Sequence, residues 1–378
     1  MIQINNNNYQ CSGCSACYTV CPKRAITLVP DNLGFKYPVV DNNLCVDCKL
    51  CEKVCPFNQE KKERAPIQVY AARNNSINDL KESRSGGVFP ALYKNIIAEG
   101  GRVYGALFDD NLNVIHQFAD NVESCKGFRG SKYVQSELGD TFQSVVCDLK
   151  QGMKVLFSGT PCQVAGLLKV VPPKLSRELY TVDIICHGVP SPRLYKDYLT
   201  YLENKNGSKV VSFNFRDKSV NGWHDHKESA ILDNGNKIVD TLYTGLFYTN
   251  CFFRESCYTC PYASTHRVAD ITLGDLWGWE SIDKTLNDDD LGVSLVFVNS
   301  EKGGRLLEIV KPSISLKQLT LEQCLQRNLK EPTSLPSIRS ELISVYESKS
   351  INGLIQFFFK PTLFQRFIRA IKRRITNG

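Results

Sequence analysis

The sequence has no long apolar run and no apolar segment near its start. No stretch approaches the roughly 18 apolar residues that a transmembrane helix needs. Residues 1–10 are polar and rich in asparagine, unlike the apolar centre of a secretory signal. These absences predict a cytoplasmic protein. In that reducing compartment the 16 cysteines would serve as metal ligands rather than form disulfides.

The positive charge is not spread evenly along the sequence. The formal net charge is +7, and most of it comes from the tail after residue 359, which contains no acidic residue. The rest of the chain is nearly neutral, which argues against a surface that binds nucleic acid. We therefore predict no nucleic-acid partner.

The basic tail has an amphipathic pattern. Its apolar residues recur at helical spacing, at Phe364, Phe367, Ile368, Ile371 and Ile375. A basic amphipathic helix over residues 360–375 would suit the surface of an anionic membrane. A terminal helix docked on its own domain, with the basic face in water, explains the pattern equally well. Peripheral attachment to the inner face of the membrane is therefore one of two expectations.

The cysteine pattern C-x2-C-x2-C-x3-C-P occurs twice near the start of the chain. Three thiolates two residues apart can bind three corners of an iron-sulfur cube, and the fourth cysteine of each run reaches the other cube. The spacing therefore predicts two 4Fe-4S clusters with crossed ligands. One cluster would be held by Cys11, Cys14, Cys17 and Cys55, and the other by Cys45, Cys48, Cys51 and Cys21.

Zinc and disulfides explain this pattern less well. Zinc sites usually take their ligands as two separated pairs, and neither run is built in that way. Two clusters with crossed ligands lie close together, so they would conduct electrons rather than perform a reaction. Electrons must then be exchanged with something else.

A length of 378 residues suggests two or three domains. We expect a small domain like a bacterial ferredoxin at residues 1–58, followed by a charged linker. Strands then alternate with helices, which is typical of an α/β fold. The whole chain is therefore expected to be mixed α/β, with a larger α/β domain at residues 67–300 and a helical region at residues 301–378.

Periodicity and turn residues locate the individual elements of the larger domain. Ser85 is expected to cap a helix that ends near residue 98. A strand ending at Phe157 leads into Ser158-Gly159-Thr160-Pro161, where glycine and an N-terminal proline predict a helix whose N-terminus faces a ligand. Residues 210–239 are expected to be rich in β-structure. Further strands are expected at 67–73, 102–108, 113–118, 180–185 and 293–299, and a helix at 140–150.

A third metal site is suggested by four further cysteines. Cys257 and Cys260 form a C-x2-C pair, whereas Cys162 and Cys186 each follow a predicted strand. Strand ends of an α/β sheet can be neighbours, so these thiols could converge. Cys162 and Cys186 could also be ordinary buried cysteines, and zinc is a competing metal at such a site.

Several motifs together resemble the β subunits of coenzyme F(420) hydrogenases and dehydrogenases, which are iron-sulfur flavoproteins. They cover residues 65–300 in the order of that family. The motifs are Ser85-Gly86-Gly87, residues 130–135, 157–163, 186–192 and 215–218, Cys257 with Cys260, and residues 269–278.

The resemblance implies FAD and a third 4Fe-4S cluster held by Cys162, Cys186, Cys257 and Cys260. Gly86 and Gly87 would let the backbone approach the FAD phosphates at a helix N-terminus, as would Gly159 and Thr160. Plain turn chemistry explains paired glycines as well, and the G-x-G-x-x-G fingerprint is absent.

Ser131 and Lys132 lie in a second motif that is expected to contact FAD. Lys132 would place a cation at the pyrophosphate or at the ring edge, although a lysine alone is more often a surface residue. His187 would orient the third cluster, pass a proton to the flavin, or simply pack. Trp277 and Trp279 are expected to belong to the core.

The function implied is that of an FAD- and 4Fe-4S-dependent oxidoreductase. Iron-sulfur clusters transfer single electrons, hydride chemistry moves two, and a flavin joins the two regimes. A soluble ferredoxin or another donor would supply electrons, and a deazaflavin-type or other small organic substrate would exchange hydride. Relatives without a deazaflavin role often accompany surface-polysaccharide synthesis. The alternatives are an electron-transfer adaptor without its own substrate and a domain that has lost its flavin.

Overall fold

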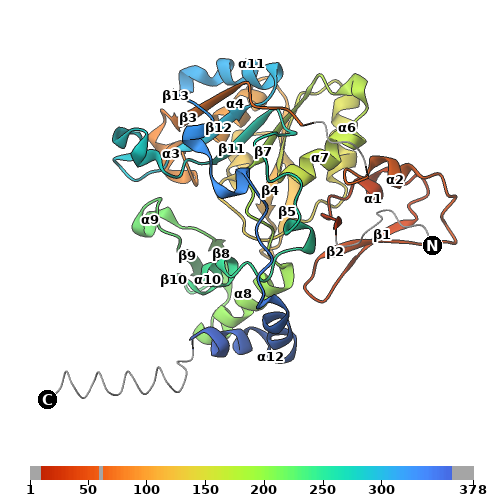
Figure 1. The fold of residues 1–378 in the computed structure, drawn as a ribbon, viewed down its shortest axis with the longest axis vertical. Helices are drawn as coiled ribbons and strands as arrows, with labels where there is room; N and C mark the ends of the chain where they lie inside the picture. The colour runs from red at the N-terminus through yellow and green to blue at the C-terminus, as the bar shows by residue number, and fades with distance from the viewer. Residues whose placement is uncertain (1–9, 59–62, 360–378) are drawn as a thin grey trace.

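The computed structural model describes residues 10–58 and 63–359 (Figure 1). The predicted amphipathic helix at residues 360–375 lies outside the described residues and stays a prediction. Within the described ranges, none of the helices combines the length and apolar character needed to cross a bilayer.

The doubled cysteine pattern of the N-terminal region folds into a doubled structure. Helices α1 (Ala16–Val20) and α2 (Leu50–Val54) flank an antiparallel hairpin of β1 (Ile26–Pro30) and β2 (Lys36–Val40). Ser15 and Lys49 precede the helices with φ angles of 62° and 58°. Each helix ends at the fourth cysteine of its run, so the two halves have matching turns.

The larger part of the chain is built on an eight-stranded mixed sheet, in the order β13-β3-β12-β11-β7-β6-β4-β5. Strands β4, β6, β7 and β11 are parallel, whereas β5, β12 and β13 run antiparallel to their neighbours. The bounds are β3 Gln68–Asn74, β4 Arg102–Phe108, β5 Val114–Ala119, β6 Val155–Gly159, β7 Leu179–Ile184, β11 Ile271–Asp275, β12 Ser294–Val298 and β13 Ile314–Leu319.

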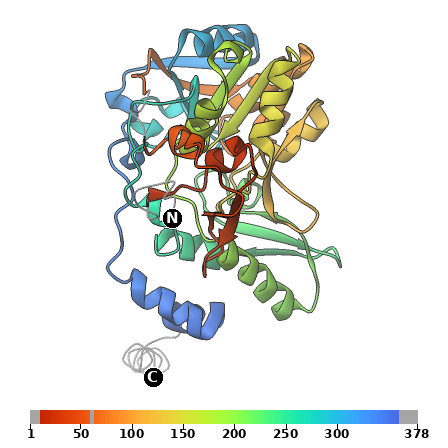
Figure 2. The same ribbon diagram turned by 90° about the vertical axis from the view of Figure 1, so that its right-hand side faces the viewer.

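Helices cover both faces of this sheet. Helices α4 (Val88–Ala98) and α11 (Glu301–Val310) pack on one face, with Leu92 and Leu306 in the shared core. Helices α6 (Thr141–Lys150) and α7 (Pro161–Val170) pack on the other face and share a core with Cys14 and Ala16 of the N-terminal region. Figure 2 shows that region against the side of the α/β layers, where α1 and α2 contact α7.

A second, three-stranded antiparallel sheet lies below the first in Figure 1. Its strands share an aromatic-rich core with the flanking helices, which includes Tyr198, Phe213 and Tyr243. The elements are α8 Pro192–Asn206, β8 Val210–Asn214, β9 Glu228–Leu232, β10 Lys237–Asp240, α10 Leu242–Tyr248 and α12 Arg339–Phe359. Short helices α3 Ile77–Glu82, α5 Val122–Cys125 and α9 Lys218–Asn221 complete the α-helices of the described residues.

The mixed α/β class and the strand-helix alternation are confirmed, but two local expectations are wrong. Gly87, with a φ of 73°, caps α4 in place of Ser85, whose hydroxyl instead donates to the Val293 carbonyl at 2.9 Å. The region after residue 301 is not entirely helical, because residues 314–319 form β13. The buried Ile314 and Leu319 attach this strand to β3 at the sheet edge.

Candidate functional site

The structure brings together one set of four cysteines from the two N-terminal runs, Cys11, Cys14, Cys17 and Cys55, here called the inner set. Burial, together with the neighbouring Cys11 and Cys55, raises the pKa of Cys14 to about 12. Burial and the same neighbours also raise the pKa of Cys17. Cys55 therefore stands with the first run, although it belongs to the second.

The remaining four N-terminal cysteines line a separate small cavity, and we call them the outer set. Ile26 and Val40 of the hairpin and Leu50 of α2 form part of its wall. Cys48 is exposed, in contrast to the buried Cys14 and Cys55 of the inner set. The outer set consists of Cys21, Cys45, Cys48 and Cys51.

Cys162, Cys186, Cys257 and Cys260, the third set, also line one cavity. Cys162 lies in the first turn of α7, and Cys186 follows β7, so the adjacent carboxyl ends of β6 and β7 bring them together. Burial, with Cys162 and Cys260 nearby, raises the pKa of Cys186 to about 12. The Val189 amide donates to Cys257 Sγ at 3.4 Å.

These three sets have the donor chemistry of iron-sulfur clusters. Four soft thiol ligands per set suit iron, and their binding to metal would require the deprotonated form that burial alone disfavours. The buried Ser12 also lines the third cavity, where its hydroxyl hydrogen-bonds with Cys162 and favours the thiolate of that cysteine. In residues 10–58 and 63–359, no group of three or more His, Cys, Asp or Glu side chains has an arrangement that could hold a single metal ion.

The inner and third sets are neighbours across α7. A Cβ atom built on Gly166 of α7 would lie 2.9 Å from Cys14 Sγ, and Cys162 belongs to the same helix. Cys14 and Cys162 also influence each other electrostatically. The order in space is therefore outer set, inner set, third set.

Replacing Gly166 with alanine is expected to destabilise the fold by about 1–3 kcal/mol, the usual cost of overpacking a core. The new methyl group would be pressed against Cys14 Cβ and Sγ, both at 2.9 Å. Gly304→Ala in α11 is the matched control because its nearest neighbour is 3.5 Å away, and helix propensity alone favours alanine there. Denaturant unfolding measures both variants; equal stability changes would contradict the close contact.

His187 lines the third cavity, but its ring is already engaged. Nδ1 lies 3.0 Å from Asn328 Oδ1, and Nε2 lies 2.8 Å from Asn250 Oδ1. The ring also contacts Phe247 and Phe253. Both ring nitrogens thus have partners within the protein, which fits an orienting and packing role, while the proton-passing role stays a prediction.

The expected phosphate loop, Ser85-Gly86-Gly87, makes close contacts with other parts of the protein. A Cβ atom on Gly86 would lie 2.2 Å from the Ala72 carbonyl oxygen and 2.5 Å from the Ser294 nitrogen. Gly86 is therefore required by its close packing on β3 and β12. The Gly87 carbonyl accepts from Asn74 Nδ2 at 2.8 Å. Neither contact needs a phosphate.

The other predicted FAD residues lie in two places. Lys132 Nζ donates to the carbonyls of Gly127 and Arg129, each at 2.8 Å, and so ties its own loop together. Burial lowers the pKa of Lys132 to about 7, while these carbonyls stabilise its ammonium form. Ser131 next to it is half-buried.

Gly159 and Thr160 form the turn directly before Cys162 of the third set, and their contact with FAD stays a prediction. Gly159 ends β6, and Thr160 precedes α7. Thr160 Oγ1 lies 3.2 Å from Cys162 Sγ, and the Thr160 amide donates to Gln163 Oε1 at 2.9 Å. These contacts fix the turn that presents Cys162.

Sequence reasoning missed a buried cationic group near the carboxyl ends of β3 and β11. Arg84 donates to the Arg216 carbonyl at 3.0 Å, and Arg216 pairs with Asp275 at 2.5 Å. Burial and the positive charge of Arg84 lower the pKa of Lys218 to about 7. Residues 215–218 form one of the motifs in the sequence, but their proximity to Arg84 depends on the tertiary fold.

Two tryptophans stand beside these cations. Trp277 stacks on the buried Trp223 with ring centroids 4.6 Å apart, and Arg216 lies over the Trp277 ring at 4.9 Å. Trp277 is 39% exposed, so its expected place in the core is wrong. The segment after β11 turns this ring outward at the edge of the sheet.

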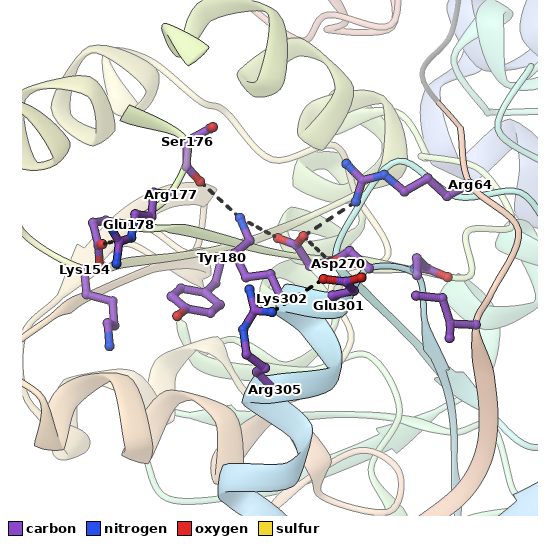
Figure 3. Close-up of a pocket in the computed structure, with 13 residues that line it drawn as sticks. Arg64, Lys154, Ser176, Arg177, Glu178, Tyr180, Asp270, Glu301, Lys302 and Arg305 are labelled. Atoms are coloured by element: carbon purple, nitrogen blue, oxygen red, sulfur yellow. Dashed lines mark hydrogen bonds and ion pairs between the residues drawn. The ribbon is translucent and has the colours of Figure 1, made fainter. Parts of the chain in front are cut away.

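A further groove, which none of the cysteines lines, lies at the amino ends of β6, β7 and β11 (Figure 3). Its basic side chains are neutralised locally: Arg64 and Lys302 both pair with Asp270, and Arg305 pairs with Glu301. Lys302 also donates to the Ser176 carbonyl at 3.1 Å. The groove is therefore a structural ion-pair network and adds no chemistry to the cysteine sites.

Comparison with known proteins agrees with this division of the chain. Residues 152–322 match the family described as the C terminus of the coenzyme F(420) hydrogenase/dehydrogenase beta subunit. Residues 10–59 match the 4Fe-4S dicluster domain. The chain is thus an iron-sulfur protein of the oxidoreductase class. It contains a C-terminal domain of the coenzyme F(420) hydrogenase/dehydrogenase beta subunit family at residues 152–322, preceded by a 4Fe-4S dicluster domain at residues 10–59.

Two curated relatives extend over most of the chain. The coenzyme F(420)-dependent sulfite reductase of Methanocaldococcus jannaschii is 27% identical over 91% of this chain and 53% of its own length. The F subunit of the F(420)H(2) dehydrogenase of Methanosarcina mazei is 24% identical over 82% of this chain and 84% of its own. The chain spans about half the length of the sulfite reductase.

Among solved structures, the F(420)-reducing NiFe hydrogenase complex of Methanosarcina barkeri contains a similar chain. The likeness has a TM-score of 0.48 at 19% identity, and it covers 81% of this chain and 96% of that one.

Proposed function

We propose that this chain conducts electrons between an external one-electron partner and a bound FAD through three 4Fe-4S clusters. The observation that carries the proposal is the row of three cysteine sets, with the inner set touching α7 beside Cys162. The exposed Cys48 makes the outer set the natural point of contact with a soluble donor such as ferredoxin. The direction of transfer depends on the partner.

The thiols of each set would hold one cluster. In the inner and outer sets, the fourth ligand would come from the opposite run, so that Cys55 and Cys21 are exchanged. In the third set, Cys162 and Cys186 would be positioned by adjacent strand ends and joined by the C-x2-C pair. The clusters supply one-electron transfer when bound.

The edge of the sheet near Arg84 offers the best place for FAD. Arg84 and Arg216 are buried cations whose Nε atoms have no hydrogen-bond partner in residues 10–58 and 63–359, and such donors suit a pyrophosphate. The exposed ring of Trp277 offers a stacking surface for an aromatic group. A bound flavin would supply the exchange between one-electron and two-electron transfer.

The substrate proposed is a deazaflavin-type carrier or another small organic molecule that exchanges hydride. Support comes from the relatives, since both are named for coenzyme F(420). A role in surface-polysaccharide metabolism stays a prediction from the sequence, as does location in the cytoplasm or at the membrane.

The test is the iron, sulfide and flavin content of the full chain after anaerobic purification. We expect about twelve irons, because three four-iron clusters are proposed, together with one FAD. Reduced ferredoxin should then reduce the flavin, and a hydride acceptor should reoxidise it. About eight irons without flavin would contradict the proposal. Zinc in place of about four irons would assign the third set to zinc.

The second candidate is an adaptor that passes electrons to a partner enzyme. It is favoured by the Methanosarcina mazei relative, which is named as one subunit of a dehydrogenase. An adaptor would accept electrons from ferredoxin but show no turnover with small hydride acceptors until a partner protein is added. Steady-state turnover of the isolated chain therefore separates the two.

A further inference from the structure

We propose that Arg254 is the internal counter-charge of the inner cluster and raises its reduction potential. The inference rests on the proposed assignment of clusters to the inner and third cysteine sets. It assigns Arg254 as a positioning and tuning residue, since its side chain reaches the thiol ligand Cys11 from the loop that carries Cys257.

Arg254 joins the two cysteine sites through its backbone and its side chain. Its amide donates to the Val189 carbonyl at 3.0 Å, and its carbonyl accepts from the Cys257 amide at 2.9 Å. The backbone is thus part of the loop of the third set. The side chain extends to the inner set, where it donates to the Cys11 carbonyl and lies 3.6 Å from Cys11 Sγ.

The remaining hydrogen bonds of the guanidinium go to neutral groups, and Arg254 also lines the third cavity, where its charge acts on Cys162. Nη1 donates to Gln135 Oε1 and Nη2 donates to the Lys36 carbonyl, each at 2.9 Å. The ring of Tyr37 lies 4.2 Å from the guanidinium carbon. Arg254 is fully buried, with 0% of its surface exposed.

A buried arginine of this kind normally faces a carboxylate. Arg267, which is also buried, faces Asp183 at 3.1 Å, and Arg216 faces Asp275. In the part of the chain that the structure describes, no carboxylate lies within ion-pair distance of Arg254, and Glu255 next to it pairs with Arg339. A buried charge without a partner is costly. Four thiolates around an iron-sulfur core provide the missing negative charge.

The loop of the inner set at residues 11–14, here called the inner loop, leaves room for the Arg254 side chain. A Cβ atom on Gly13 would lie 2.9 Å from Arg254 Nη1 and 2.6 Å from Gln135 Nε2. Gly13 has a φ of 70°, and its counterpart in the second run, Asp47, adopts a similar φ of 51°. The backbone conformation therefore does not require glycine at this point of the repeat. Gly13 is needed because Arg254 occupies the space, which distinguishes the inner loop from the outer one.

The expected consequence is electrostatic. Reduction adds a negative charge to a cluster, and burial opposes that charge. A fixed cation and an N–H group directed at a ligand sulfur stabilise the reduced form, and both are recognised determinants of cluster potential. Arg254 would therefore offset the effect of burial and let the inner cluster accept electrons from the exposed outer cluster.

The test is a redox titration of the full-length Arg254→Gln protein, followed by electron paramagnetic resonance. We expect one cluster midpoint potential to fall by about 59 mV or more, which is a tenfold change in a one-electron equilibrium constant. Arg254→Lys keeps the charge and should give a smaller shift. Arg102→Gln is the matched control. Arg102 pairs with Asp148 at 2.7 Å, and this pair lies outside the three cysteine sets.

Gln135→Glu is a second test that leaves Arg254 in place. The new carboxylate would accept from Nη1 and neutralise the guanidinium, so the same potential should fall, whereas Gln135→Met should have a smaller effect. If the variants retain their iron and every cluster potential equals that of the wild type, the proposal for Arg254 is overturned. A wild-type protein without clusters would instead overturn the proposed function, so the two failures are distinguishable.

Discussion

Replacing Cys55 with alanine is expected to remove the inner cluster and to leave the outer cluster intact. Cys55 belongs to the second run but stands with Cys11, Cys14 and Cys17. About four of about twelve irons should be lost. Because the inner set is the link between the outer set and α7, ferredoxin should still reduce the outer cluster but no longer the flavin. Iron analysis and stopped-flow spectroscopy measure the two effects.

Cys21→Ala is the reciprocal variant, and Cys147→Ala is the control. Cys21 lines the outer cavity, so its loss should remove the outer cluster while dithionite still reduces the inner one. Cys147 is exposed and belongs to none of the three sets, so its replacement should change neither iron content nor transfer. Loss of the outer cluster in the Cys55 variant would show that the ligands are not crossed.

Replacing Cys186 with serine is expected to disconnect the flavin from both N-terminal clusters. Cys186 follows β7 and lies beside Cys162 and Cys260. Its replacement therefore removes one of the four thiols proposed to hold the third cluster. Ferredoxin should then bleach the N-terminal clusters in the visible spectrum while the flavin stays oxidised. The iron content should fall by about four.

Cys125→Ala is the control for this variant, since Cys125 is also buried but lies in the core beside α4. It should keep its iron and its flavin reduction, apart from a modest loss of stability. Normal flavin reduction by ferredoxin in the Cys186 variant would mean that the third set is not on the electron path. The inner cluster would then deliver electrons to the flavin directly.

The segment Ser85-Gly86-Gly87 shows that phosphate binding and close packing of strands leave the same pattern in a sequence. Ser85-Gly86-Gly87 has the composition of a phosphate loop, yet Gly86 is explained by its distance of 2.2 Å to the Ala72 carbonyl oxygen. A glycine that admits a ligand and a glycine that admits a neighbouring strand have the same sequence signal. Only the packing partner distinguishes them, and that partner lies in another strand.

The sequence by itself determined the features that depend on neighbouring residues. The start of α7 at Pro161 is where the glycine-proline pattern predicted it. The alternation of strands and helices determined the α/β class. These features are set within one or two turns of chain, where hydrogen bonds and sterics are local.

The tertiary structure alone decided which sites adjoin one another. It placed Cys14 against Gly166, engaged both ring nitrogens of His187, and sent the side chain of Arg254 to Cys11. Each of these contacts joins segments far apart in the chain. Their positions depend on how whole layers pack. Apolar periodicity marks which face of an element is buried, but because burial of apolar surface acts without direction, it does not say which other face that element meets.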